Sequence, residues 1–217
     1  MQEILIVGLY SYLAGSIPFG LILSKIFLKQ DIRQSGSGNI GATNVLRTGG
    51  KLLGLLTLIL DGLKGYIAVL VTMKYYQDYI FLSALLSFLG HLFPIWLKFK
   101  GGKGVATYVG ILFAINIVYG FIFITNWLFI FFLSKYSSLS SLIATLSIPV
   151  YIYVSGNADG ISFFLIIFVL IFYTHRENVK RLNIDECNGN KNQSLKCNKI
   201  QDRCWSFNIC FCWFYFC

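Results

Sequence analysis

The sequence predicts an all-α integral membrane protein with seven transmembrane helices. Its mean hydropathy is +0.68, and 56% of its 217 residues are hydrophobic whereas only 12% are charged. In soluble domains about a quarter of the residues are charged, so this composition is that of a protein embedded in lipid. A hydrocarbon layer of roughly 30 Å requires about 20 apolar residues per helix, so the chain can supply several spans.

Six apolar stretches are separated by polar or glycine-rich segments. They cover residues 4–27, 52–73, 79–97, 105–134, 139–154 and 161–174. The first has no basic region before it and no small-residue cleavage site after it, so we expect it to remain as a span. The stretch 105–134 exceeds one span, and Asn116 with Gly120 predicts a turn that divides it in two. This division gives seven helices.

The distribution of basic residues supports seven spans, because each extra helix moves every later loop to the other side of the membrane. With the amino terminus outside, only Lys74 falls in an outer loop. The inner side then carries Lys25, Lys29, Arg33, Arg47, Lys51, Lys98, Lys100, Lys103, Lys135, Arg176, Lys180 and Arg181. The formal charge of +9 therefore reports membrane orientation, and nucleic acid is not an expected partner. Four polar segments share the cytoplasmic face in this topology: residues 34–47, 98–104, 135–141 and 175–181.

The first polar segment contains Gly36, Gly38 and Gly41 at the spacing of a dinucleotide-binding fingerprint. That fingerprint requires a preceding strand and a βαβ unit, which a membrane helix does not provide. Glycine N–H groups can nevertheless approach an anion, with polar side chains and one arginine beside them. The candidate phosphate-binding residues are Ser37, Gly38, Asn39, Gly41, Thr43, Asn44 and Arg47. An ordinary loop with capping residues and a surface arginine is the alternative.

The second polar segment contains Gly101, Gly102, Lys103 and Gly104. Lys103 is followed by glycine, not by the serine or threonine of a nucleotide-binding P-loop, so nucleotide hydrolysis is disfavoured. Glycines on both sides of a lysine still suit an anion, and a flexible linker with positive-inside lysines is the alternative. His91 lies at the inner end of its helix, where a packing role is favoured over a catalytic one.

The third and fourth segments add polar side chains at helix ends. Ser138 and Ser141 lie on one helical face, and helix capping explains them adequately. His175 and Asn178 also share a face, and they form a credible acid/base and orienting pair. The alternative for this pair is the basic end of a membrane helix.

Asp61 and Lys64 are neighbours inside the second span, where isolated charges are costly, so we expect them to pair. The pair either lines a substrate pocket or joins helices as a buried ion pair. All six cysteines lie beyond residue 186, so no cysteine-based metal site is expected in the membrane region. Cys210 and Cys212 lack a second pair at zinc-site spacing. We expect neither a metal nor a cofactor.

Six segments together resemble the bacterial acyl-phosphate:glycerol-3-phosphate acyltransferase family, the PlsY proteins. The resemblance covers about residues 4–182. The segments that carry it are Gly15–Pro18, Gly36–Arg47, Asp61–Gly65, Gly90–Pro94, Lys100–Thr107 and His175–Asn178. Their joint occurrence, order and spacing make the resemblance specific.

The resemblance implies a multi-pass enzyme of the bacterial inner membrane that takes part in phospholipid synthesis. Such an enzyme moves a fatty acyl group from acyl phosphate to the 1-hydroxyl of glycerol 3-phosphate, giving lysophosphatidic acid and phosphate. The lipid bilayer and the enzyme that makes acyl phosphate are the implied partners. The implied site residues are Ser37 and Arg47, the phosphate-binding loop of residues 101–104, His175 with Asn178, and one serine that maps to Ser138 or Ser141.

Acyl phosphate is a mixed anhydride that is already activated, so a covalent acyl-enzyme is unnecessary and direct transfer is expected. Either His175 or the departing phosphate takes the hydroxyl proton. A small transporter, with Asp61, Lys64 and His91 lining a passage, is the rival from another functional class. A related enzyme with another acyl donor or acceptor is the third possibility.

We expect two regions: a membrane acyltransferase domain at residues 1–182, and an atypical tail at 183–217. The tail carries every cysteine and a terminal aromatic cluster. A frameshifted or read-through terminus would explain this abrupt change in composition, and a genuine reduced cytosolic tail is the alternative.

Overall fold

The computed structural model describes residues 1–156 and 159–188, and these ranges contain helices and loops but no strand. The predicted all-α class is therefore confirmed. The α-helices of the described part are α1 (Gln2–Ser16), α2 (Phe19–Leu23), α3 (Ala42–Tyr75), α4 (Ile80–Leu92), α5 (Val105–Ile115), α6 (Ile117–Ser134), α7 (Ser137–Val154) and α8 (Ile161–Asn188). Single-turn segments η1 (Ser24–Leu28), η2 (Ile32–Gln34), η3 (Gln77–Tyr79) and η4 (Ile95–Leu97) connect some of them. Most of the predicted tail lies outside the described residues.

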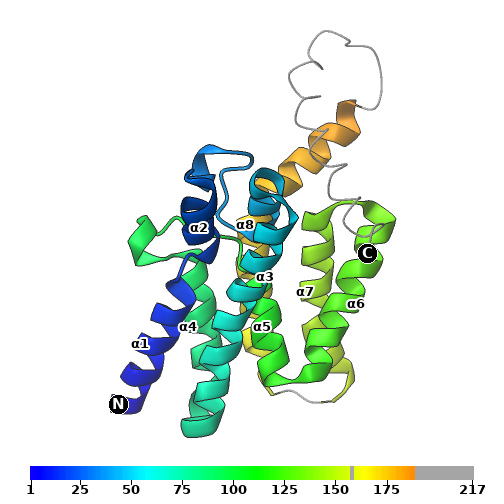
Figure 1. Cartoon of the computed structure of the whole chain (residues 1–217). Helices are drawn as coiled ribbons and strands as arrows, with labels where there is room; N and C mark the ends of the chain where they lie inside the picture. The colour runs from blue at the N-terminus through cyan, green and yellow to red at the C-terminus, as the bar shows by residue number, and fades with distance from the viewer. Residues whose placement is uncertain (157–158, 189–217) are drawn as a thin grey trace.

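The helices run back and forth through one bundle. In the described residues, six segments are long and apolar enough to cross a membrane, and α5 adds a shorter apolar helix of 11 residues. At 1.5 Å per residue, α5 extends only about 16 Å, roughly half of the hydrocarbon layer. Figure 1 shows successive passes alternating in direction, with the amino terminus at the end opposite the α6–α7 connection. The predicted seven passes are thus present, one of them short.

The predicted division of the longest apolar stretch is confirmed at Asn116. This residue ends α5 in an extended conformation and begins α6 as its N-cap, with its side-chain oxygen accepting a hydrogen bond from the Val118 N–H at 2.9 Å. Gly120, expected in the same turn, lies instead inside α6. A side chain at Gly120 would overlap the Phe113 ring, so this glycine allows the two helices to approach closely.

The first span is interrupted near its middle, which the sequence analysis did not predict. Helix α1 ends at Ser16 and α2 begins at Phe19, leaving Ile17 and Pro18 between them. Proline has no backbone N–H and disfavours helical geometry in the residue before it, so the helix breaks here. One consequence is that the Ile17 carbonyl becomes available to a neighbouring helix.

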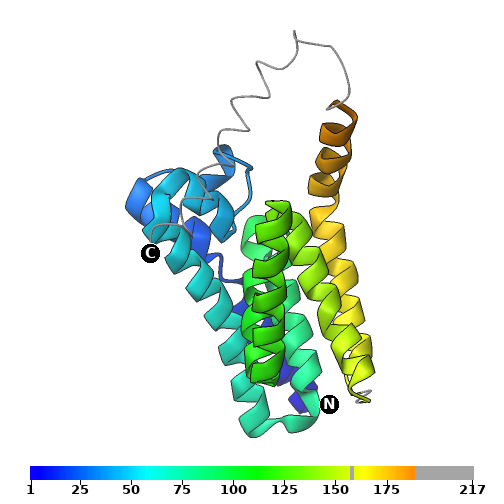
Figure 2. The same cartoon turned by 90° about the vertical axis from the view of Figure 1, so that its right-hand side faces the viewer.

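Helix α3 begins at Ala42, not at residue 52 as predicted, because a short helical arm precedes the expected span. The arm and the main helix meet at Gly50, whose φ of 84° and ψ of 177° break the helical geometry. Leu46 of the arm packs against Gly54 of the main helix, where an added Cβ would lie 2.7 Å from the Leu46 Cβ. Figure 2 shows this arm beside the upper end of the bundle, near α2.

Small residues let the helices pack closely. Helix α1 packs on α4, α3 on α5, and α6 on α7. A Cβ at Gly15 would overlap the Ser87 carbonyl, and one at Gly110 would overlap the Gly62 carbonyl. Such close backbone approach is the usual way that membrane helices gain packing energy, since lipid tails are as apolar as the side chains. The interior is filled mainly by aromatic and branched side chains, including Phe88, Tyr108, Phe123, Phe164, Ile111 and Ile167.

Gly110→Ala should destabilise the α3–α5 contact. The new methyl group would overlap the Gly62 carbonyl oxygen, and overpacking of this kind costs about 1–3 kcal/mol. Gly62→Ala is the matched control, because its Cβ would lie 3.5 Å from the Ala106 carbonyl oxygen, an ordinary contact. Thermal denaturation in detergent should show a lower melting temperature for Gly110→Ala only. Equal melting temperatures for the two variants would contradict this packing.

Candidate active site

Asn44, on the arm of α3, organises the first polar segment. Its side chain is buried, and its Nδ2 group lies 3.1, 3.0 and 2.8 Å from the carbonyl oxygens of Ile32, Ser35 and Asn39. Its Oδ1 atom accepts a hydrogen bond from the Ser37 N–H at 2.8 Å. These contacts use both hydrogens and the oxygen of the amide. The expectation that Asn44 donates to a phosphate is therefore corrected: it holds the loop in shape.

Gly36 is required by this loop for a steric reason. Its φ of 61° lies in the left-handed region, and an added Cβ would overlap the Oδ1 atom of Asn44. A larger residue would therefore be strained and would displace the organising amide.

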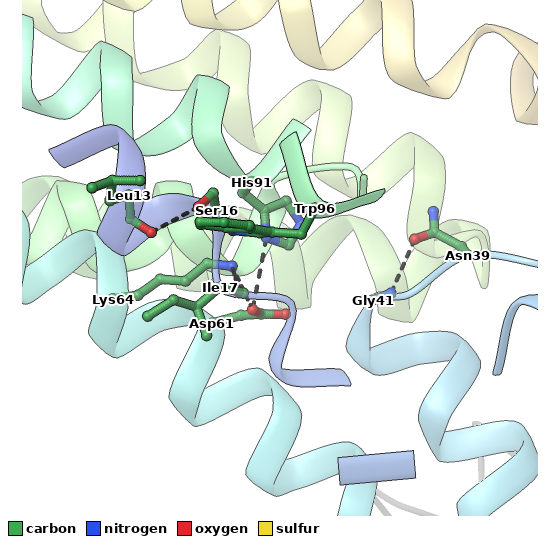
Figure 3. Close-up of polar contacts among 9 residues, drawn as sticks. All are labelled: Leu13, Ser16, Ile17, Asn39, Gly41, Asp61, Lys64, His91 and Trp96. Carbon is green, nitrogen blue, oxygen red and sulfur yellow. Dashed lines mark hydrogen bonds and ion pairs between the residues drawn. The ribbon is translucent and has the colours of Figure 1, made fainter. Parts of the chain in front are cut away.

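The other candidates of the first segment differ in exposure. The Asn39 side chain accepts the Gly41 N–H at 3.0 Å (Figure 3), so that pair stabilises the turn before α3. Ser37 and Thr43 are exposed, and Arg47 is half-buried on the arm of α3. The side chains that a ligand could reach in this segment are therefore Ser37, Thr43 and Arg47.

A second arginine in the same region, Arg33, forms an ion pair within the loop. The Arg33 guanidinium binds both oxygens of Asp31, with the shortest contact at 2.5 Å, and the Asp31 carboxylate also accepts the Arg33 N–H. These hydrogen bonds lower the pKa of the Asp31 carboxyl to about 2.

The glycine loop between α4 and α5 is attached to the end of α4. The Gly101 N–H donates to the Leu92 carbonyl at 3.0 Å, and the Gly102 N–H donates to the His91 carbonyl at 3.1 Å. Both N–H groups therefore satisfy carbonyls that the end of a helix leaves unpaired. Phosphate binding by the loop of residues 101–104 stays a prediction, to which these two N–H groups do not contribute while they are paired in this way.

The groups of this loop that could bind an anion are Lys103 and the N–H groups of the first turn of α5. Gly104, with a φ of 83°, is the N-cap of α5, and the N–H groups of the first helical turn lack partners within the helix. Lys103 precedes this turn and is half-buried. A lysine next to a helix N-terminus forms an electrostatically favourable place for a phosphate.

His175 is buried on α8. Its Nδ1 atom lies 2.9 Å from the Ile171 carbonyl oxygen. A carbonyl can only accept, so Nδ1 carries the proton, and in the neutral imidazole Nε2 keeps its lone pair. Thr174, which the sequence analysis did not single out, has its hydroxyl 3.4 Å from the Lys103 carbonyl oxygen. In the sequence Thr174 is simply a threonine next to His175, and this position does not predict a contact with Lys103.

The serines at the start of α7 are not caps, contrary to the interpretation favoured from the sequence. Tyr136 is the N-cap and makes no side-chain capping bond. The Ser141 hydroxyl donates to the Ser137 carbonyl at 2.9 Å and accepts from the Trp127 indole N–H at 3.1 Å. Ser138 is half-buried, and in the described part of the chain no hydrogen bond to its hydroxyl is found. Of the two candidates, Ser138 is therefore the one whose hydroxyl is available to a ligand.

The charged residues of α3 form a buried cluster with α4 (Figure 3). The Lys64 Nζ atom lies 2.8 Å from Asp61 Oδ1, with side chains 3% and 2% exposed, so the predicted pairing is confirmed. Lys64 Nζ also donates to the Ile17 carbonyl at 2.7 Å, the carbonyl released where α1 breaks. The His91 Nδ1 atom lies 3.7 Å from the same Asp61 oxygen. Burial of all three side chains favours the helix-joining interpretation over a substrate pocket.

The four polar segments gather toward one end of the bundle, opposite the amino terminus (Figure 1). Thr174, immediately before the fourth segment, contacts Lys103 of the second. The arm of α3 places the first segment beside α2, and the third lies at the α6–α7 connection. Asn178 is half-exposed one helical turn beyond His175. The sequence prediction that these segments share one end is confirmed, whereas the side of the membrane stays a prediction.

This fold and site define a class: a multi-pass helical membrane protein with a polar, basic site at one end of an apolar bundle. The sequence profile described as glycerol-3-phosphate acyltransferase matches residues 5–184. A glycerol-3-phosphate acyltransferase of Pelagibacter ubique is 65% identical over 185 residues, covering 85% of this chain and 96% of that protein. The corresponding protein of Brucella canis is 47% identical over 174 residues, covering 80% and 87%.

Two solved structures show the same architecture. The crystal structure of PlsY, an integral membrane glycerol 3-phosphate acyltransferase, in its glycerol 3-phosphate form matches with a TM-score of 0.79 and 37% identity, covering 92% of this chain and 98% of that one. The lysophosphatidic acid form matches with a TM-score of 0.78 and 39% identity, covering 84% and 93%. The chain belongs to the glycerol-3-phosphate acyltransferase family. The transporter interpretation is therefore set aside.

Asn44→Ala should loosen the first polar segment. It would remove the amide that contacts three loop carbonyls, and a buried polar group left unsatisfied costs about 1–3 kcal/mol. We expect faster trypsin cleavage at Lys29 and Arg33 and at least a tenfold loss of transferase activity, a magnitude of the order set by misplaced binding groups. Thr48→Val is the control, because it replaces only a hydroxyl that is bonded to its own helix and keeps the shape of the side chain. Wild-type protease resistance in Asn44→Ala would show that the amide does not organise the loop.

Proposed function

We propose that this chain transfers a fatty acyl group from acyl phosphate to the 1-hydroxyl of glycerol 3-phosphate, giving lysophosphatidic acid and inorganic phosphate. The observation that carries the proposal is the contact between Thr174 of α8, the chain neighbour of His175, and Lys103 of the glycine loop, which precedes the first turn of α5. An anion-binding group and a proton acceptor thus meet at the end of a lipid-embedded bundle. Both proposed substrates carry a phosphate, and one carries a long alkyl chain.

The phosphates are held by charge and by helix geometry in this proposal. Lys103 and the N–H groups of the first turn of α5 bind one phosphate, since both favour negative charge. Arg47, with Ser37 and Thr43 beside it, binds the other, because a guanidinium grips phosphate with two parallel hydrogen bonds. Ser138 is a further hydroxyl for the polar end of a substrate.

The reaction is a direct transfer between the two bound substrates. The glycerol oxygen attacks the acyl carbonyl carbon, the bond from that carbon to the phosphate oxygen breaks, and inorganic phosphate leaves. His175 Nε2 takes the hydroxyl proton in this scheme, because the lone pair lies on that atom while Nδ1–H is bonded to Ile171. Asn178, on the same helical face, orients the acceptor hydroxyl.

The orientation proposed from charge places the site on the cytoplasmic side of a bacterial inner membrane and the amino terminus outside. Glycerol 3-phosphate then reaches the site from the cytosol. Acyl phosphate is amphiphilic and arrives along the membrane, and the enzyme that makes it is the proposed partner. No cofactor takes part in this scheme.

Purified protein in lipid should release phosphate and lysophosphatidic acid when given acyl phosphate and glycerol 3-phosphate. We expect acyl-CoA not to replace acyl phosphate, because the basic site is proposed to recognise a phosphate joined directly to the acyl carbon. Product formation is followed by mass spectrometry. Turnover with acyl-CoA at the acyl-phosphate rate would contradict the proposed donor while leaving the family assignment intact.

His175→Gln should lower kcat by about 10²–10⁴-fold, the usual contribution of a positioned general base. Glutamine keeps a polar side chain but cannot take the proton near neutral pH. The variant should also lose the acidic limb of the pH–kcat profile. Tyr173→Phe, which removes an exposed hydroxyl on the same helix, is the control. Full turnover by His175→Gln would assign the proton to the departing phosphate.

A further inference from the structure

His91 is a buried imidazole that the transfer reaction does not use. Only 4% of the residue is exposed, and it lies in the last turn of α4, which η4 separates from the glycine loop in the chain. Its Nδ1 atom faces the Asp61 carboxylate at 3.7 Å. Its Nε2 atom lies so close to Gly102 that an added Cβ there would overlap it. The ring therefore fills the space between the charged cluster of α3 and the backbone of the loop.

The loop is held against α4 by both backbone and side chain of the same residue. The His91 carbonyl accepts the Gly102 N–H, and the Leu92 carbonyl accepts the Gly101 N–H. The imidazole supports the other side of Gly102. These contacts fix the two residues that immediately precede Lys103.

The imidazole is itself braced by the buried ion pair. Asp61 faces His91 on one side and Lys64 on the other, and Lys64 is tied to the Ile17 carbonyl. Figure 3 shows the His91 ring beside this pair. Rotating the ring away from Asp61 would leave a carboxylate in the interior with one contact fewer, which is unfavourable in a low-dielectric interior.

We propose that His91 is a positioning residue that sets the place of the glycine loop and so of Lys103 at the phosphate. Asp61 and Lys64 hold the imidazole, the imidazole supports Gly102, and Gly102 leads directly into Lys103. His91 itself touches no substrate. The inference rests on the proposed phosphate-binding role of the loop.

The contact between His91 and Gly102 can be tested by mutual suppression. We compare His91→Ala, Gly102→Ala and the double variant in lipid, measuring kcat and the KM of both substrates. Each single change should raise the KM of one phosphate substrate about tenfold, because small displacements of a binding group have effects of this order. The double variant should be no worse than Gly102→Ala alone, since the smaller side chain leaves room for the new methyl group. Effects that multiply in the double variant would overturn the proposal.

Two further variants separate positioning from general stability. Ser87→Ala removes a buried hydroxyl one turn earlier on α4, bonded only to its own helix, and should leave both KM values unchanged. His91→Gln, which keeps a polar side chain, should retain the wild-type melting temperature yet show the raised KM. A wild-type KM in His91→Gln, or an equal change in Ser87→Ala, would refute the positioning role.

The test also separates failure of this inference from failure of the proposed donor. Stabilisation by glycerol 3-phosphate, measured as a thermal shift without any acyl donor, should be present in the wild type. If the loop holds that phosphate, the shift should shrink in His91→Gln. If it holds the donor phosphate, the KM of acyl phosphate should rise and the shift should stay. A wild type inactive with acyl phosphate would count against the donor, and a wild-type shift and KM in His91→Gln would count against the inference.

Discussion

A buried ion pair at the break in the first span is the interaction on which the rest of the site depends. Where proline stops α1, the Ile17 carbonyl is left without a helical partner, and Lys64 supplies one. Asp61 balances that lysine and faces His91 on α4. Helices α1, α3 and α4 are therefore joined at one point. Burying charge is costly, so such a pair persists only where each member has partners, and here the partners come from α3, α4 and the break between α1 and α2.

Several glycines of the polar segments are needed for close packing of the backbone. Gly101 and Gly102 pass so close to the end of α4 that side chains would overlap it, and their N–H groups satisfy carbonyls of that helix. The groups proposed to bind an anion are therefore Lys103 and the N–H groups of the first turn of α5, which follow these two glycines in the chain. Thr174, the neighbour of His175 on α8, contacts Lys103 there. In the proposed reaction the substrates are aligned by groups fixed at helix ends, which would keep the reacting groups in place.

The passes of the bundle were predictable because hydropathy and length act locally, and the turn at Asn116 followed from the same reasoning. The arm before Gly50 was missed because its sequence is polar and glycine-containing, and because the packing of Leu46 against Gly54 is a tertiary contact. For some candidate residues the structure shows partners that the sequence did not predict. The amide of Asn44 and the N–H groups of the glycine loop looked free to bind phosphate. Their actual partners are carbonyls distant in the chain or across a turn, which no local pattern reveals.

The most direct test of the junction is a double-mutant cycle on Asp61 and Lys64. Melting temperature and the KM of both substrates are measured for Asp61→Asn, Lys64→Met and the double variant. Each single change strands a buried charge, so we expect each to be more damaging than the double change, in which neither charge remains. Single effects that simply add in the double variant would show that the two charges act independently, and would contradict the junction as the support of the site.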